Sequence, residues 1–375
     1  MRIQHTLLIT VLIFSTTLKA QHSLSDKEAT QETAALFSNL LKIREKGYLV
    51  GHQDALAYGV KWKYIPGKSD IKDVVGEYPA LYGWELGHIE RGAHLNLDSV
   101  PFDKMKDFIK EGYSRGGIIS LSWHGNNPLT GKSAWDPVSG TVSSILPGGA
   151  KHETFLEQLD KVAAFLADLK GKKGESIPVL FRPFHELTGH WFWWGAKSCS
   201  PVEYIRLFRF TINYLKVDKQ LHNLIVVYNT GTEISSKAEF LERYPGDDYV
   251  DVLSFDTYQH SNLPIDTSFV NKLRECLSIV GEVANERNKL AAVGEIGFNQ
   301  VAYSHWFTGV LQPALQNSKI AYVLLWRNAG YKPHDGSTEF YAPYPGHNSA
   351  ADFVRFYCAP ETFFEKDARK LKLYK

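Results

Sequence analysis

Short apolar runs recur along the chain, and each is closed by polar or glycine-containing sequence. Runs of this length that are rich in β-branched and aromatic residues are typical of strands. We predict eight strands, at residues 48–52, 80–85, 117–123, 178–183, 224–228, 252–255, 291–295 and 321–326. Several of them are apolar throughout, which is the pattern of strands that are buried on both faces. The chain therefore favours a parallel sheet covered by helices.

Segments with helical periodicity occupy most of the intervals between these strands. The clearest lie at residues 30–45, 102–113, 153–169, 202–215, 270–287 and 304–315. The first precedes the first strand, so we expect it to cover the bottom of a barrel. Strands that alternate with helices in this way predict an α/β protein with a single (β/α)8 TIM barrel.

The first twenty residues have a different character. A basic Arg2, an apolar stretch at 7–14 and a small Ala20 are typical of a secretory signal peptide cleaved before Gln21. We therefore expect residues 21–375 to form the barrel, in a secreted or periplasmic protein. No cysteine near the cleavage point could carry a lipid anchor, and no other stretch is apolar enough to insert into a membrane.

Composition narrows the classes of partner. The chain has 42 basic and 41 acidic residues, a net charge of +1, and this balance gives no electrostatic reason to expect nucleic acid or an anionic membrane. Cys199, Cys276 and Cys358 are widely spaced, which argues against a disulfide scaffold or a zinc ribbon. We expect no metal, no organic cofactor and no obligate protein partner.

Long loops follow the predicted strands at residues 59–69, 87–100, 125–150, 188–200 and 329–348. In a barrel such loops gather on the face that holds the active site. Glu186 and Glu295 end the fourth and seventh predicted strands, so their carboxyl groups can converge at the barrel mouth. Paired carboxylates that flank a scissile bond carry out glycoside hydrolysis.

Aromatic residues are concentrated directly after Glu186, as Trp191, Phe192, Trp193 and Trp194. We interpret these four as a platform on which sugar rings stack. Glu186, beside aromatics and opposite a second carboxylate, should have a raised pKa and serve as a general acid. Glu295, between two glycines, should remain ionised as a nucleophile.

Two competing motifs do not fit their context. His185 and His190 resemble a zinc-protease pair, but five residues separate them instead of four, which places them on different helix faces. Ser114 lies in a G-x-S-x-G pattern, yet it ends a helix instead of following a strand. A zinc hydrolase using His185 and His190 stays open as an alternative, as does a non-catalytic carbohydrate-binding protein, which would not need both glutamates.

The motifs Arg-Pro-Phe-His-Glu at 182–186, Gly-His-Trp-Phe-Trp-Trp-Gly at 189–195 and Gly-Glu-Ile-Gly at 294–297 resemble glycoside hydrolase family 26. The resemblance covers nearly all of the chain after residue 20. It implies a retaining β-1,4-mannanase acting on β-mannan or galactomannan, with Glu186 as acid/base and Glu295 as nucleophile. Another retaining β-glycanase, a β-1,3-xylanase or a mixed-linkage glucanase, is the alternative within the class, and internal cleavage is not distinguished from release of mannobiose.

The same resemblance implies roles near the acid. His185 lies beside Glu186, Trp191 lines the cleft, and His124, in Ser-Trp-His-Gly-Asn-Asn-Pro at 122–128, contacts the sugar at the cleavage point.

Further roles follow from matches near other strand ends. Tyr258 is expected to hydrogen-bond the nucleophile and Asp256 to support it. Trp326 matches a stacking tryptophan after the last strand, and Arg327 matches a neighbouring sugar contact. Trp135 is a further expected substrate contact, in a loop whose length varies in the family.

Overall fold

Eight parallel strands form the centre of the molecule. The computed structural model describes residues 24–333 and 335–375, so the predicted signal peptide lies outside the described residues. The strands are β1 (Tyr48–Gln53), β4 (Leu81–Glu85), β5 (Ile118–Trp123), β6 (Val179–Pro183), β7 (Leu224–Thr230), β8 (Val252–Gln259), β9 (Leu290–Phe298) and β10 (Tyr322–Leu325). Each pairs with the next, and β10 pairs with β1, which closes the barrel. The predicted (β/α)8 fold and all eight strands are confirmed.

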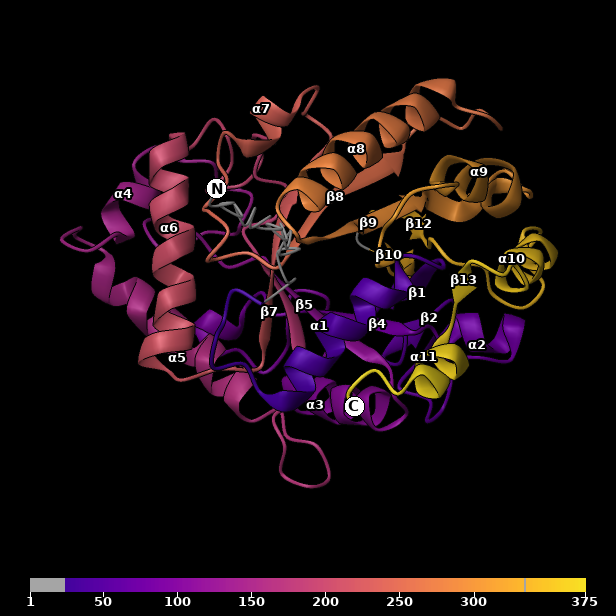
Figure 1. Cartoon of the computed structure of the whole chain (residues 1–375), viewed down its shortest axis with the longest axis horizontal. Helices are drawn as coiled ribbons and strands as arrows, with labels where there is room; N and C mark the ends of the chain where they lie inside the picture. Colours follow the sequence, from indigo (N-terminus) through magenta and orange to yellow (C-terminus); the bar gives the residue numbers. More distant parts are fainter. Residues whose placement is uncertain (1–23, 334) are drawn as a thin grey trace, which may run out of the picture.

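Helices surround the strands (Figure 1). Predicted helices appear as α3 (Phe102–Ser114), α5 (His152–Ala167), α6 (Pro201–Asn213) and α8 (Thr267–Glu286), and the segment after β9 as a π-helix (Phe307–Leu311) continued by α9 (Gln312–Leu315). The helices that were not predicted are mostly shorter: α2 (Asp70–Val75), α4 (Thr141–Ile145), α7 (Lys237–Leu241), α10 (Ala350–Tyr357) and α11 (Glu365–Leu371). One or two turns are too short to show a clear helical period.

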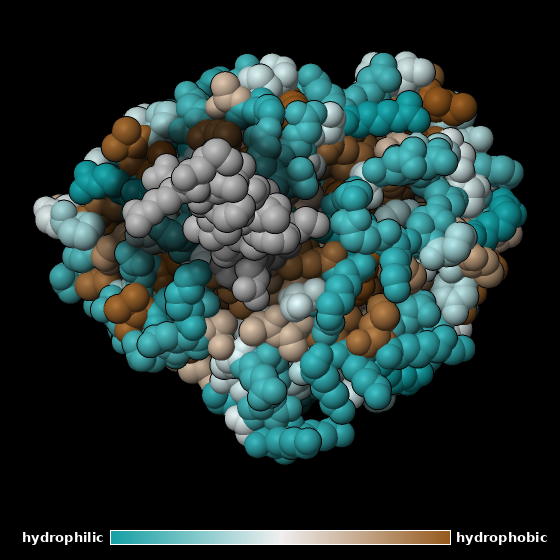
Figure 2. Space-filling model, viewed as in Figure 1, coloured by the Kyte–Doolittle hydropathy of each residue, from teal (hydrophilic) through white to brown (hydrophobic). Residues whose placement is uncertain are grey.

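Helix α1 (Gln31–Ile43) covers the bottom of the barrel, as predicted. Its apolar side chains Leu36, Phe37 and Leu40 are buried in one cluster with inward-facing residues near the strand starts, such as Leu49 and Ile118. A second cluster fills the layer between the strands and the surrounding helices. The surface in the view of Figure 2 is mostly hydrophilic. Among the described residues, no helix combines the length and apolarity needed to cross a membrane.

The mouth of the barrel carries two short hairpins. Strands β2 (Tyr58–Gly59) and β3 (Trp62–Lys63) lie in the loop after β1, and β11 (Gly330–Lys332) and β12 (Ser337–Glu339) lie in the loop after β10. At the bottom, β13 (Thr362–Phe363) adds to β1. Cys199 and Cys276 are buried free thiols, and Cys358 is an exposed one.

A β-bulge in β9 sets the direction of Glu295. Phe255 of β8 lies opposite Val293, but the next residue, Asp256, lies opposite Glu295, so Gly294 is an extra residue. A β-carbon on Gly294 would lie 2.1 Å from Oδ1 of Asn229, which leaves room for glycine alone. Bulges of this kind re-aim the side chains that follow them, and here the side chain that follows is Glu295.

Candidate active site

Glu186 lies just beyond the end of β6, in a strained turn. Phe184 and Glu186 both have a φ of 51°, in the left-handed region that side chains with a β-carbon rarely adopt. The Trp191 indole Nε1–H donates a 2.7 Å hydrogen bond to Oε2 of Glu186. Burial, and after it the charge of Glu295, raises the pKa of Glu186 to about 7. The predicted direction is confirmed, and the side chain can hold a proton near neutral pH.

Glu295 is only 4% exposed and is held by two donors. Arg182 Nη2 donates to Oε1, and the Tyr258 hydroxyl donates a 2.6 Å hydrogen bond to Oε2. Arg182 also donates through Nη1 to Asp256 Oδ2 at 2.8 Å. One buried guanidinium therefore lies between two carboxylates and fixes the orientation of Glu295.

Two histidines connect this pair to a third buried carboxylate. Glu85 accepts hydrogen bonds from the backbone N–H of His124 at 2.7 Å and from its Nδ1 at 2.8 Å. Burial lowers the pKa of His124, but the Glu85 carboxylate outweighs burial, so the pKa of His124 is raised. Burial and the charge of Arg182 hold the pKa of His185 well below its usual range. The Nε2 atoms of the two rings are 2.9 Å apart. The opposite directions of the two pKa shifts favour His124 as the donor and His185 as the acceptor in this contact.

The aromatic run after Glu186 does not form the predicted four-residue platform. Phe192, Trp193 and Trp194 are 2%, 1% and 0% exposed, so the interpretation is wrong for these three. They pack as local core, and Trp194 Nε1 donates to the backbone oxygen of His185 at 2.8 Å, which anchors the turn that carries Glu186. Trp191 alone in the run is half-buried beside the acid.

Trp135 presents an open aromatic face. It is 48% exposed, and its ring lies nearly parallel to that of His124, with 5.0 Å between the ring centroids. The structure thus brings Trp135, His124, His185 and Trp191 to one side of the site.

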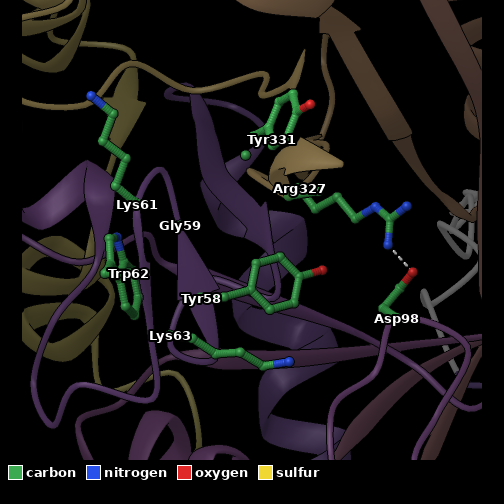
Figure 3. A pocket seen from close by; sticks show the side chains of 10 residues that line it. Tyr58, Gly59, Lys61, Trp62, Lys63, Asp98, Arg327 and Tyr331 are labelled. Atoms are coloured by element: carbon green, nitrogen blue, oxygen red, sulfur yellow. Dashed lines mark hydrogen bonds and ion pairs between the residues drawn. The ribbon is translucent and has the colours of Figure 1, made fainter. Parts of the chain in front are cut away.

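Trp326 and Arg327 follow β10, and both are half-buried. Arg327 forms ion pairs with Asp98, in the loop after β4, and with Glu339 of β12. Figure 3 shows Arg327 reaching toward Asp98, with Tyr58 and Tyr331 beside it. These residues line a pocket of about 500 Å³ that also includes Lys61 and Lys63, and we call it the charged pocket.

Two buried charged residues were not singled out from the sequence. Arg182 lay inside a quoted motif, and a buried arginine in a strand requires an acidic partner. Glu85 ends the second predicted strand as Glu186 and Glu295 end theirs, so the same criterion would have found it.

The residues around Arg182 also bear on the zinc alternative. His190 is exposed, whereas His185 is buried against His124. Among the described residues, ligand atoms of His185, Asp256 and Glu295 lie within 4.8 Å of one another. Arg182 already bonds both carboxylates, so this set does not suit a metal ion.

Comparison with known proteins places the chain in a family. The model of glycosyl hydrolase family 26 matches residues 25–312. The chain belongs to this family. A mannan endo-1,4-β-mannosidase of Bifidobacterium adolescentis is 33% identical over 353 residues, and one of Thermothelomyces thermophilus is 29% identical over 307 residues. The matches cover 89% and 76% of this chain but only 34% and 55% of those two relatives.

Solved structures of family 26 enzymes have the same fold. A family 26 β-mannanase from Bacteroides ovatus superposes with a TM-score of 0.87 at 44% identity, covering 92% of this chain and 98% of that one. A modular endo-β-1,4-mannanase from Cellulomonas fimi superposes with a TM-score of 0.83 at 32% identity, covering 92% and 78%.

Proposed function

We propose that this family 26 protein is a retaining endo-β-1,4-mannanase. The observation that carries the proposal is the unequal carboxylate pair: Glu186, whose pKa is raised to about 7, and Glu295, held by Arg182 and Tyr258. Two carboxyl groups in different environments can divide the roles of acid and nucleophile. The relatives described as mannan endo-1,4-β-mannosidases support mannan as the substrate and internal cleavage as the mode.

The reaction proceeds by double displacement. A Glu295 oxygen attacks the anomeric carbon while Glu186 donates its proton to the glycosidic oxygen, so the bond to the leaving sugar breaks as the glycosyl-enzyme bond forms. Glu186, now ionised, takes a proton from a water molecule that attacks the same carbon. The sugar leaves with its β configuration, Glu295 is released as a carboxylate, and Glu186 is protonated again.

The side chains around the pair have roles that follow from their contacts. Trp191 donates to the ionised form of Glu186 between the two steps, and Tyr258 and Arg182 position the attacking carboxylate. His124, Trp135, Trp326 and Arg327 offer polar groups and ring faces to the substrate on either side, and no step requires a metal ion or an organic cofactor.

Replacement of the nucleophile tests the proposal. Glu295→Ala should abolish mannan hydrolysis while the melting temperature shows a folded protein, and proton NMR of the wild-type reaction should show the β-anomer first. An α-anomer as the first product, or a Glu295→Ala variant with near wild-type turnover, would overturn it. Lichenan and β-1,3-xylan in parallel test the other β-glycanase activities, and a chelator should leave the rate unchanged.

The time course of the products tests internal cleavage. An endo-acting enzyme lowers the viscosity of mannan before short products accumulate. Steady release of mannobiose at nearly constant viscosity would instead establish cleavage from chain ends.

We also propose that residues 1–20 direct export of the protein, on the basis of their basic start, apolar stretch and small residue at Ala20. Mass spectrometry of the protein from periplasmic or culture fractions should find Gln21 as the first residue. Recovery of the uncleaved chain from the cytoplasm alone would contradict export.

A further inference from the structure

A second cavity opens at the barrel mouth between the ends of β8 and β9. It has a volume of about 590 Å³, which lies within the range of ligand pockets. Its polar lining includes Tyr258, His260, Asn262, Asn299, Gln300 and Tyr341. We call it the amide pocket.

The lining of the amide pocket contains no Asp, Glu, Lys or Arg. Its polar groups are amides, phenols and an imidazole, which supply both donors and acceptors. The charged pocket differs, because Lys61, Lys63 and Asp98 line it. An ionic ligand finds no counter-charge in the amide pocket, whereas an uncharged ligand with many hydroxyl groups finds partners for them.

Some of these polar groups are free and others are fixed. His260 and Asn262 are exposed and form no side-chain hydrogen bond with any residue that the structure describes. Asn299 accepts from the backbone N–H of Phe340 at 3.2 Å, and Gln300 Nε2 donates to the backbone oxygen of Thr338 at 3.0 Å. The pocket thus combines a rigid side, held by the segment around β12, with two side chains that are available to a ligand.

One side chain separates the amide pocket from the nucleophile. The Tyr258 hydroxyl bonds Glu295, and Tyr258 also lines the pocket. Tyr341 packs edge-on against Tyr258, with ring centroids 5.6 Å apart, and lies so close to Gly297 that a β-carbon there would be 2.2 Å from its ring. The scissile bond of the substrate must lie between Glu186 and Glu295, and the pocket adjoins that place through Tyr258.

We propose that the amide pocket binds an uncharged hexosyl branch of the substrate, such as a galactosyl side group of galactomannan. The proposal rests on the proposed mannanase function and adds to it a preference for substituted chains. A branch that enters the pocket gains hydrogen bonds from Asn262 and His260, and a linear chain does not reach them.

The ratio of kcat/KM on galactomannan to kcat/KM on linear mannan tests the branch pocket. Asn262→Ala and His260→Ala should each lower this ratio about threefold to tenfold, the effect of one lost hydrogen bond. Ala302→Trp, which places a large ring among the lining residues, should lower it further. The matched control is Asn285→Ala, an exposed asparagine at the far end of α8, and it should leave the ratio at the wild-type value.

An equal loss of kcat/KM on galactomannan and on linear mannan would overturn the proposal, because it would assign the pocket to a main-chain sugar unit. Three pocket variants that all keep the wild-type kcat/KM on both substrates would overturn it as well. Binding separates this failure from that of the proposed function. Titration calorimetry with galactosyl-mannotriose and mannotriose should show tighter binding of the branched sugar, and Asn262→Ala should remove the difference, whether or not mannan is hydrolysed. Equal affinity of the wild-type protein for the two sugars would refute the branch pocket alone.

Discussion

Substitution Trp191→Phe removes one hydrogen-bond donor from the catalytic acid and keeps an aromatic ring. The indole Nε1–H lies 2.7 Å from Glu186 Oε2, and a hydrogen bond of this kind favours the ionised carboxylate and lowers its pKa. Without it, the pKa of Glu186 should rise above its present value of about 7. The acid then stays protonated to a higher pH.

The size of the effect follows from the two forms of the carboxyl group. A hydrogen bond contributes about 1.5 to 3 kcal/mol when one partner is charged and about 0.5 to 1.5 kcal/mol when both are neutral. The difference is about 1 to 1.5 kcal/mol, and about 1.4 kcal/mol corresponds to one pKa unit. We therefore expect the alkaline limb of the pH profile to move upward by about one pH unit.

The assay is the dependence of kcat/KM on pH, which reports the ionisation of the free enzyme. Wild-type kcat/KM should fall above pH 7 as Glu186 loses its proton, and the fall in Trp191→Phe should begin about one pH unit higher, whatever the loss in absolute rate. Trp135→Phe is the matched control, since Trp135 stacks on His124 and, in the described part of the chain, the hydrogen bond to the acid comes from Trp191 instead. A limb that stays in place or moves to lower pH in Trp191→Phe would refute the reasoning.

Three further substitutions test other contacts. Arg182→Met leaves Asp256 and Glu295 buried without their shared cation, so kcat/KM should fall at least about 100-fold. A folded variant that retains a tenth of the wild-type kcat/KM would contradict this. Gly294→Ala forces a β-carbon against neighbouring side chains, which costs about 1 to 3 kcal/mol, and calorimetry should find a melting temperature lower by about 2 to 6 °C. Burial raises the pKa of Asp54 to about 7, so the contribution of Asp54 to stability is present below pH 4 and is lost as the pH rises through 7. In Asp54→Asn the melting temperature should therefore depend less on pH between about 4 and 7. An unaltered pH dependence of the melting temperature would show that Asp54 is not responsible for it.

The barrel could be predicted because its strands are short, largely apolar and closed by polar residues, which is the usual pattern of a parallel sheet covered on both faces. Helices α2 and α7 could not be predicted from the sequence, since a helix of one or two turns gives no periodic signal. Glu186 and Glu295 followed from their place at strand ends. The bulge at Gly294 could not be predicted in this way, because a bulge depends on pairing with β8 and not on the local sequence of β9.

The aromatic run shows why burial is harder to predict than residue type. A tryptophan in a loop can stack on a ligand or pack beneath the loop, and the sequence is the same in both cases. Trp193 and Trp194 pack in the hydrophobic core, and their indole N–H groups can be buried there because they reach the backbone oxygens of Gly125 and His185 at 2.9 and 2.8 Å. Those acceptors lie on other turns of the chain, so only the folded backbone determines which ring remains beside the acid.

The difference between the two glutamates likewise comes from the backbone. Both lie toward the mouth of the barrel, Glu295 within β9 and Glu186 just beyond β6, yet only Glu295 meets Arg182, because the bulge at Gly294 directs it toward the barrel interior. Glu186 lies beyond a left-handed turn, where its hydrogen-bond donor is the neutral indole of Trp191 and where burial raises its pKa. A charged donor holds the nucleophile, and a neutral donor leaves the acid able to keep its proton. Two residues of one type thus acquire two roles from a bulge and a turn, neither of which is a property of glutamate.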